Sequence, residues 1–205
     1  MIRKPYIHML LILALGFGVY FNSVTVPFYF DDHTCIENNP AVKNFSYFGD
    51  YSRLSQLPIL QDIKNNFILR PVAYFSFALN YRLHGIDVFG YHVVNIIIHI
   101  FNAILVYLLL ALALRTPYFA EQGCRTGSGP TEDSLLPLFT GLLFVAHPMQ
   151  TQAVTYVCQR FISLATLFCL GSMVLYAASR LDPVKTGRRM LYGLSLLSAI
   201  LAMFT

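Results

Sequence analysis

The chain has 205 residues, of which 56% are hydrophobic and only 12% are charged, and its mean hydropathy is +0.57. Soluble domains carry about a quarter charged residues, so the composition excludes an ordinary soluble protein and predicts an all-α integral membrane protein. The formal net charge of +4 is modest. Because the basic residues are scattered or lie near the ends of apolar runs, nothing favours nucleic-acid binding.

The first apolar run, 6–26, follows a short basic N-terminus and is long enough to cross about 30 Å of hydrocarbon. We expect it to be a retained transmembrane helix with its N-terminus in the cytoplasm. A cleaved signal peptide is the alternative, but this run exceeds the usual apolar region of about 7–15 residues. Four more membrane helices are expected, at about 91–114, 135–147, 155–179 and 190–205.

The segment 27–90 is mixed in composition and rich in aromatic residues. We expect it to be a long non-cytoplasmic loop, because the densest basic cluster, at 180–189, marks the opposite side of the membrane as cytoplasmic. Within the loop, 71–81 is apolar but too short to span, and Arg70 and Arg82 bracket it. This pattern is typical of a helix lying along the interface, although a small soluble subdomain fits the composition nearly as well.

Two adjacent carboxylates, Asp31 and Asp32, appear where the first apolar run gives way to this loop. Ionisable groups at a membrane surface are costly and usually functional, so these residues are the leading candidates for a catalytic site. The alternative is an ordinary solvated loop start or a helix N-cap, for which aspartate is common.

A polar stripe interrupts the apolar helix expected at 91–114. Its four members, spaced by three, four and three residues, are His92, Asn95, His99 and Asn102. This spacing puts all four on one helical face, which should point to the bundle interior or a wet cavity rather than to lipid. Two interpretations stay open: interhelical hydrogen bonds worth about 1 kcal/mol each, or, for His92 near the membrane surface, an approach to the site.

The third helix should end or kink at Pro148, which cannot continue a helical hydrogen-bond pattern. The polar segment after it should turn on the non-cytoplasmic side. The cysteines, which lack metal-ligand spacing, are Cys35, Cys124, Cys158 and Cys169. No metal site is therefore expected, and most of these thiols should be free. Only Cys35 and Cys158 share the non-cytoplasmic side, which leaves a disulfide between them open.

Five segments in this order resemble the transmembrane and tetratricopeptide-repeat O-mannosyltransferase-like proteins, in particular their bacterial relatives. The segments are F-Y-F-D-D-H (28–33), N-N-P (38–40), R-P-V-A-Y-F-S-F-A-L-N-Y-R-L-H-G (70–85), Y-H-V-V-N-I-I-I-H-I-F-N-A-I-L-V-Y (91–107) and H-P-M-Q-T-Q-A-V-T-Y-V-C-Q-R (147–160). The resemblance implies a polytopic helical bundle of the GT-C glycosyltransferase superfamily. It also implies tetratricopeptide repeats downstream, so residues 1–205 would be an incomplete N-terminal fragment.

The resemblance implies an inverting transferase that moves a sugar, by resemblance mannose, from a polyprenyl phosphate to a hydroxyl such as a protein Ser or Thr. The superfamily's essential carboxylate follows the first helix, where Asp31 and Asp32 lie, and one of them would act as general base; Asp32 is slightly favoured. Candidate ligands of the donor phosphate are Arg160, Arg70 and His147. The alternatives are an interfacial anchor for Arg160 and a cap at the helix break for His147.

Membrane lipid, the donor and the hydroxyl acceptor are the expected partners. No cofactor is expected, and the sequence does not decide whether the reaction needs a divalent metal. The bacterial inner membrane is the expected location, or the endoplasmic reticulum membrane in a eukaryote.

One departure from the family pattern concerns Gln152, which stands where H-P-x-x-T-E-A-V has glutamate. Glutamine keeps hydrogen bonding but loses charge, so either that glutamate is structural or the activity here is altered or lost. A non-catalytic scaffold that anchors a repeat domain is therefore the competing hypothesis. A transporter would need paired broken helices, and the sequence shows one break, at Pro148.

Overall fold

The computed structural model describes residues 5–119 and 134–205, and within these ranges the chain is helical without β-strands. Three of the described helical segments are long and apolar enough to cross a membrane: Pro5–Ser23, Val88–Leu114 and Val157–Leu181. The predicted all-α membrane fold class is thus confirmed. Cys124 and the basic N-terminal residues Arg3 and Lys4 lie outside the described residues.

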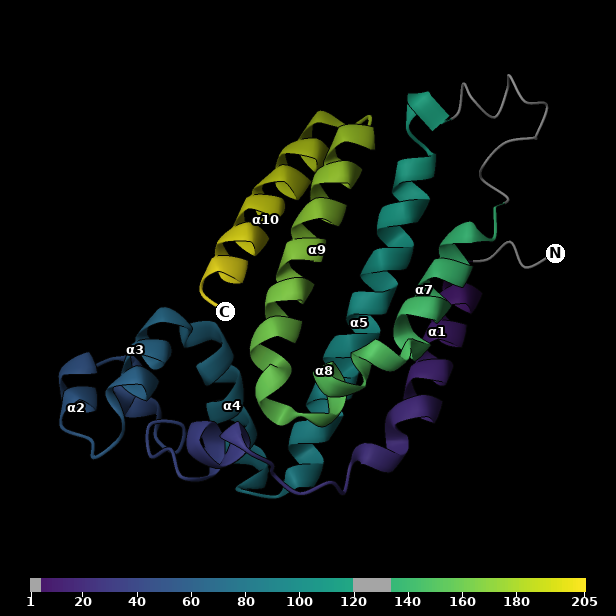
Figure 1. The fold of residues 1–205 in the computed structure, drawn as a ribbon. Helices are drawn as coiled ribbons and strands as arrows, with labels where there is room; N and C mark the ends of the chain where they lie inside the picture. The colour runs from purple at the N-terminus through teal and green to yellow at the C-terminus, as the bar shows by residue number, and fades with distance from the viewer. Residues whose placement is uncertain (1–4, 120–133) are drawn as a thin grey trace.

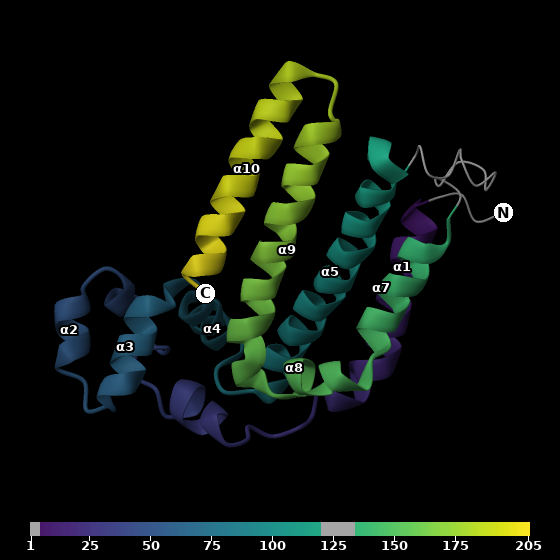
Figure 2. The same ribbon diagram turned by 45° about the horizontal axis from the view of Figure 1, so that its top comes forward.

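The membrane bundle consists of two groups of helices that share α5 (Figures 1 and 2). On one side α1 (Pro5–Tyr20) and α7 (Leu136–Ala146) pack on α5 (Val88–Leu114) and on each other. On the other side α9 (Arg160–Leu181) packs on α5 and forms an antiparallel hairpin with α10 (Lys185–Met203).

Several helix boundaries differ from the ranges expected from hydropathy: α1 ends at Tyr20 rather than 26, α10 begins at Lys185 rather than 190, and the starts of α5 and α9 also shift. α5 begins at Val88 rather than 91, because the Asp87 side chain caps it by accepting a hydrogen bond from the Phe89 N–H, 3.1 Å away. The helix expected at 155–179 begins at Arg160, since a short α-helix and a 3-10 turn occupy most of the segment before it. Hydropathy locates such helices, but capping sets their ends.

Glycines allow α1, α5 and α7 to approach closely. A Cβ atom added to Gly16 would lie 2.6 Å from Ile100 Cγ1, and one added to Gly141 would lie 2.7 Å from Ile12 Cδ1. Small residues at helix contacts are the usual means of close packing in membranes, where van der Waals contact drives association.

We therefore expect Gly16→Val to lower the free energy of unfolding by about 1–3 kcal/mol, the usual cost of overpacking. Gly18→Val is the matched control in the same helix, because a Cβ atom there meets nothing within 4 Å. Unfolding of both full-length variants in detergent measures the difference. Equal loss of stability in the two variants would contradict the close packing described.

The loop between α1 and α5 folds into a separate helical cluster at one end of the bundle (Figure 1). Its elements are η2 (His33–Glu37), η3 (Phe45–Phe48), α2 (Tyr51–Ser55), α3 (Gln61–Leu69) and α4 (Pro71–His84). α4 buries Tyr74 and Phe77, whose rings contact that of Phe161 in α9 at 5.1 and 5.3 Å between centroids. Its opposite face exposes further apolar side chains, among them Leu79 and Leu83, so this helix is docked on the bundle and is apolar on both faces.

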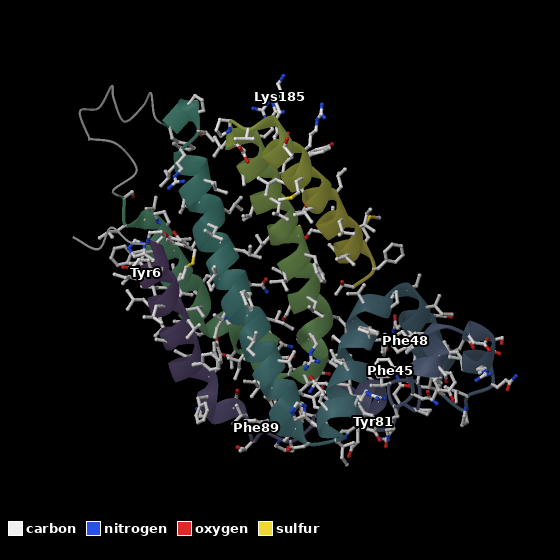
Figure 3. The ribbon with its side chains drawn as sticks, turned by 180° about the vertical axis from the view of Figure 1, so that it is seen from behind. Tyr6, Phe45, Phe48, Tyr81, Phe89 and Lys185 are labelled. Atoms are coloured by element: carbon white, nitrogen blue, oxygen red, sulfur yellow. The ribbon has the colours of Figure 1, made fainter. Side chains whose placement is uncertain are left out.

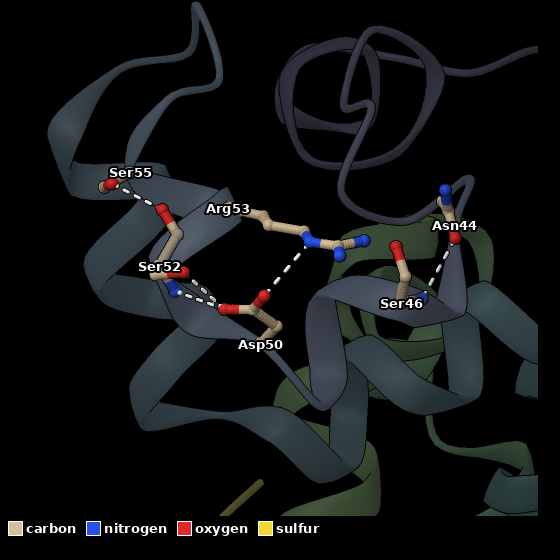
Figure 4. Close-up of polar contacts among 6 residues, drawn as sticks. All are labelled: Asn44, Ser46, Asp50, Ser52, Arg53 and Ser55. Carbon is tan, nitrogen blue, oxygen red and sulfur yellow. Dashed lines mark hydrogen bonds and ion pairs between the residues drawn. The ribbon is translucent and has the colours of Figure 1, made fainter.

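Polar side chains begin the short helices of this cluster (Figure 4). The Asn44 side chain accepts a hydrogen bond from the Ser46 N–H at 2.9 Å, and Asp50 accepts one from the Ser52 N–H at 3.1 Å. Asp50 also forms an ion pair with Arg53 at 3.0 Å. Such caps satisfy N–H groups that have no partner inside the helix.

The loop cluster and the basic α9–α10 turn lie at opposite ends of the bundle. Figure 3 places Phe45, Phe48, Tyr81 and Phe89 toward one end and Lys185, the first residue of α10, at the other. This is the arrangement that the charge bias predicts for two sides of a membrane. Which end faces the cytoplasm stays a prediction.

Candidate active site

An open pocket of about 880 Å³ lies between the start of the loop after α1 and the segment after α7. Its lining residues are Tyr29, Phe30, Asp31, Pro148, Met149, Thr151, Gln152, Thr155, Tyr156 and Gln159. Two motifs that are far apart in the sequence, 28–33 and 147–160, therefore form the two walls of one pocket.

The second wall is a series of short helices that follow the break at Pro148. α7 ends at Ala146, and the Nδ1 atom of His147 accepts a hydrogen bond from the Met149 N–H at 3.2 Å. This caps a 3-10 turn, η5 (Pro148–Gln150), which leads into α8 (Thr151–Thr155) and then η6 (Val157–Gln159). The predicted break is present, and His147 is exposed and acts as its cap rather than lining the pocket.

Asp31 is exposed and lines the pocket. Its backbone N–H donates a hydrogen bond to the Tyr156 hydroxyl, 3.1 Å away on the opposite wall. Burial raises the pKa of Tyr156 to about 12, so this phenol keeps its proton at neutral pH and can also donate to the Asp31 carboxylate. The pocket thus combines an accessible carboxylate with a neutral donor.

Asp31 and Asp32 follow a turn at Phe30. Phe30 has a φ of 52°, in the left-handed region, which costs a residue with a Cβ roughly 1–2 kcal/mol. The turn brings the Asp32 N–H within 3.1 Å of the Tyr29 carbonyl oxygen, and strained conformations of this kind concentrate at functional sites. Asp31 and Asp32 are successive helical residues, so their side chains project about 100° apart and meet different surroundings.

Asp32 is 1% exposed and is not among the described residues that line the pocket. Its Oδ1 accepts a hydrogen bond from the Cys158 N–H at 2.7 Å, and its Oδ2 accepts one from the Tyr29 N–H at 3.2 Å. The sequence slightly favoured Asp32 as the base. In the structure its carboxylate instead joins the two walls, while Asp31 faces the space where a substrate could bind.

We expect Asp32→Asn to lower the free energy of unfolding by about 1–3 kcal/mol, because the amide has one acceptor oxygen and leaves one buried N–H facing another donor. Asp31→Asn, at an exposed position, is the matched control and should change stability little. Thermal unfolding of the full-length protein compares them. If both variants unfold at the wild-type midpoint, Asp32 is not a structural link.

Arg160 is fully buried and lies away from the pocket. Its guanidinium donates hydrogen bonds to Asn95 Oδ1 at 2.7 Å, Asn80 Oδ1 at 2.9 Å and the Tyr91 carbonyl oxygen at 2.9 Å. It also lies 4.6 Å from the Phe77 ring centroid. A fully buried position does not fit an interfacial anchor, and the role of phosphate ligand stays a prediction. In the described residues Arg160 joins α4, α5 and α9.

Arg70, the other cationic candidate, is exposed at the start of α4, and its guanidinium lies 5.4 Å from the centroid of the Phe161 ring. It is not among the described residues that line the pocket. The structure therefore brings neither of the two arginines to Asp31.

The polar stripe on α5 is buried, as its spacing predicts. His92 hydrogen-bonds the Val26 carbonyl at 2.8 Å, Asn95 that of Val157 at 3.3 Å, His99 that of Val145 at 3.1 Å, and Asn102 that of Ser163 at 3.0 Å. Of the described residues that line the pocket, none belongs to the stripe. Its contacts are those of interhelical hydrogen bonds that hold α5 to both groups of helices and to the pocket wall.

The described residues include free thiols but no cluster of metal-binding side chains. Within 5–119 and 134–205, no group of three or more His, Cys, Asp or Glu side chains is placed to hold a metal ion. Cys35, Cys158 and Cys169 are free thiols.

Comparison with known proteins finds relatives over most of the chain. It is 31% identical over 191 residues to protein O-mannosyl-transferase Tmtc3 of Drosophila melanogaster, a match of 85% of this chain and 20% of that protein. Protein O-mannosyl-transferase F38B6.6 of Caenorhabditis elegans is 28% identical (84% of this chain, 23% of that protein), and TMTC4 of Homo sapiens is 27% identical (91% and 25%).

The chain thus spans about a fifth to a quarter of the length of these curated relatives. No family model matches it, and no solved structure does.

Proposed function

Because the chain belongs to the family of the Tmtc-type protein O-mannosyl-transferases, we propose that its pocket takes part in sugar transfer at a membrane. The donor is a polyprenyl-phosphate sugar, the sugar is mannose, and the acceptor is a hydroxyl of a protein Ser or Thr. The observation that carries this proposal is the convergence of the segments 28–33 and 147–160 on one pocket, with Asp31 accessible in it.

The proposed reaction is a single displacement that inverts the anomeric carbon. The acceptor hydroxyl attacks that carbon while the bond to the phosphate oxygen breaks, and the lipid phosphate leaves with the electron pair. The carboxylate of Asp31 accepts the hydroxyl proton, a role that requires it to lie within hydrogen-bond reach of the acceptor. An accessible carboxylate suits this role better than the buried and doubly hydrogen-bonded Asp32.

Neutral hydrogen-bonding groups make up the rest of the polar lining: the hydroxyls of Thr151, Thr155 and Tyr156 and the amides of Gln152 and Gln159. Such groups can orient sugar hydroxyls and donate to phosphate oxygens. The described lining residues include no lysine or arginine. We therefore propose that these residues bind the acceptor and the sugar ring, and that the phosphate charge is met by other parts of the full-length protein.

The finer localisation follows from the charge pattern. We propose a GT-C-type protein with the N-terminus in the cytoplasm and the pocket on the non-cytoplasmic side of either the bacterial inner membrane or the endoplasmic reticulum membrane. The basic residues at the α9–α10 turn support this orientation, because such clusters stay cytoplasmic.

Gln152 lines the pocket together with Asp31, so its replacement by the family's glutamate tests what the missing charge does. A second carboxylate nearby disfavours the ionised form of the first. Because the base must be ionised, the acidic limb of the pH–rate profile should move to higher pH in Gln152→Glu. An unchanged profile in an active, folded variant would show that residue 152 does not act on the base.

The test of the proposed function uses the full-length protein purified in lipid. Transfer is measured from radiolabelled polyprenyl-phosphate mannose, with the glucose-charged lipid as control, to Ser- and Thr-containing peptides. We expect mannose transfer that exceeds glucose transfer. If the folded protein transfers no sugar from any polyprenyl phosphate to any hydroxyl acceptor, the proposal fails, and the competing hypothesis of a membrane scaffold, supported by Gln152, takes its place.

A further inference from the structure

Two cysteines that are far apart in the sequence meet behind the pocket. Cys35 lies in η2 and Cys158 in η6, and the two thiols are close enough for each to affect the pKa of the other. Both side chains pack in the same apolar cluster, where Cys158 is buried and Cys35 is partly buried. The Asp32 carboxylate holds the segments of the two cysteines together, because it accepts a hydrogen bond from the Cys158 N–H and lies three residues before Cys35 in the chain.

We propose that Cys35 and Cys158 form a disulfide that ties the two walls of the pocket together. Asp31, on the first wall, lies shortly before Cys35 in the same loop segment. Tyr156 and Gln159, on the second wall, flank Cys158. A covalent bond between the thiols would therefore fix the wall that carries the carboxylate against the wall that carries most of the hydrogen-bonding groups. This goes beyond the proposed sugar transfer and does not depend on it.

The bond forms by thiol–disulfide exchange with an oxidant that itself carries a disulfide, such as oxidised glutathione or an oxidised dithiol protein. The Cys35 thiolate attacks one sulfur of the oxidant, forms a mixed disulfide and releases a thiol. The Cys158 thiolate then attacks the Cys35 sulfur and releases the second thiol. Each cysteine loses one proton, and the two electrons pass to the oxidant, whose disulfide is reduced.

Cys35 is suited to react first. It is only partly buried, whereas Cys158 is 7% exposed. The neighbouring Cys158 thiol also lowers the pKa of Cys35, which raises the fraction of reactive thiolate. Once the mixed disulfide exists, the neighbouring Cys158 is in place to resolve it.

The first test maps disulfides in the full-length protein. Native membranes are incubated with oxidised glutathione and then dissolved in a denaturing detergent with a maleimide that blocks free thiols, and peptides are analysed by mass spectrometry without reduction. We expect a linked peptide pair that contains Cys35 and Cys158, with Cys169, a free thiol within α9, alkylated as the internal control. Cys35 and Cys158 both recovered as alkylated thiols, or linked to other cysteines, would overturn the proposal.

A second test asks whether Cys35 and Cys158 form a covalent bond or only lie close together. A disulfide that closes so long a loop restricts the unfolded chain, so the oxidised wild type should unfold at least about 5 °C above the reduced one. Cys35→Ser should lose this redox-dependent shift, whereas Cys169→Ser should keep it. An equal shift in Cys35→Ser, or no shift in the oxidised wild type, would contradict the proposed bond. Neither readout measures sugar transfer, so failure here leaves the proposed function standing, and the reverse also holds.

Discussion

Arg160→Ala is expected to lower the free energy of unfolding by about 2–5 kcal/mol, the usual cost of truncating a large buried side chain. The guanidinium is fully buried. Its removal leaves the side-chain oxygens of Asn80 and Asn95 without the donors that they have now, and the Tyr91 carbonyl, which lies within α5, loses its donor from outside the helix. Each orphaned side-chain acceptor costs about 1–3 kcal/mol, and the missing side chain also leaves a void beside Phe77.

Two further variants make this prediction specific. Arg160→Lys keeps the charge but cannot present the planar fork that reaches all three acceptors, so its loss should be intermediate. Arg70→Ala removes an exposed guanidinium that only lies over a ring, and should cost less than about 1 kcal/mol. Unfolding of the full-length variants in detergent measures all three. If Arg160→Ala is as stable as Arg70→Ala, the buried network does not hold α4, α5 and α9 together.

Asp31→Asn is expected to reduce sugar transfer by about 10²- to 10⁴-fold, the usual contribution of a general base. Asparagine has nearly the same shape and keeps the backbone hydrogen bond to the Tyr156 hydroxyl, but its amide cannot take up the acceptor proton. Binding of the donor lipid should persist. Initial rates at saturating donor, together with donor binding, measure the effect, with Gly18→Val as an unrelated control variant that should transfer at the wild-type rate.

Much of the architecture could be predicted because hydropathy and spacing report on it directly. The spans over α1, α5 and α9 follow from their apolar length, and the three-four-three spacing places His92, Asn95, His99 and Asn102 on one buried face. The break after α7 follows from Pro148, which cannot supply a helical N–H. These features depend on residues near one another in the sequence.

The roles of the two aspartates could not be predicted, since the sequence offers two adjacent carboxylates and favours Asp32 only slightly. The left-handed turn at Phe30 sets the orientation of both, and nothing marks it in the sequence, because glycine or asparagine usually occupies such positions. Burial of Asp32 also depends on the Cys158 N–H, which only the folded chain brings near.

The buried surroundings of Arg160 could not be predicted for a related reason. Its position beside a membrane span suggests a phosphate ligand or an anchor, but its partners Asn80 and Asn95 belong to two other helices. The sequence does indicate that polar residues in apolar helices need buried hydrogen-bond partners. Only the folded structure shows that Arg160 is the partner of Asn80 and Asn95.

One paired measurement tests whether Asp31 acts as the base while Asp32 links the two walls of the pocket. Full-length wild type, Asp31→Asn and Asp32→Asn are assayed in lipid for mannose transfer and for thermal midpoint in the same preparations. We expect that Asp31→Asn retains the wild-type midpoint and loses transfer, while Asp32→Asn unfolds at a lower temperature. An Asp31→Asn variant that transfers at the wild-type rate, or a fully stable Asp32→Asn variant that transfers nothing, would contradict these roles.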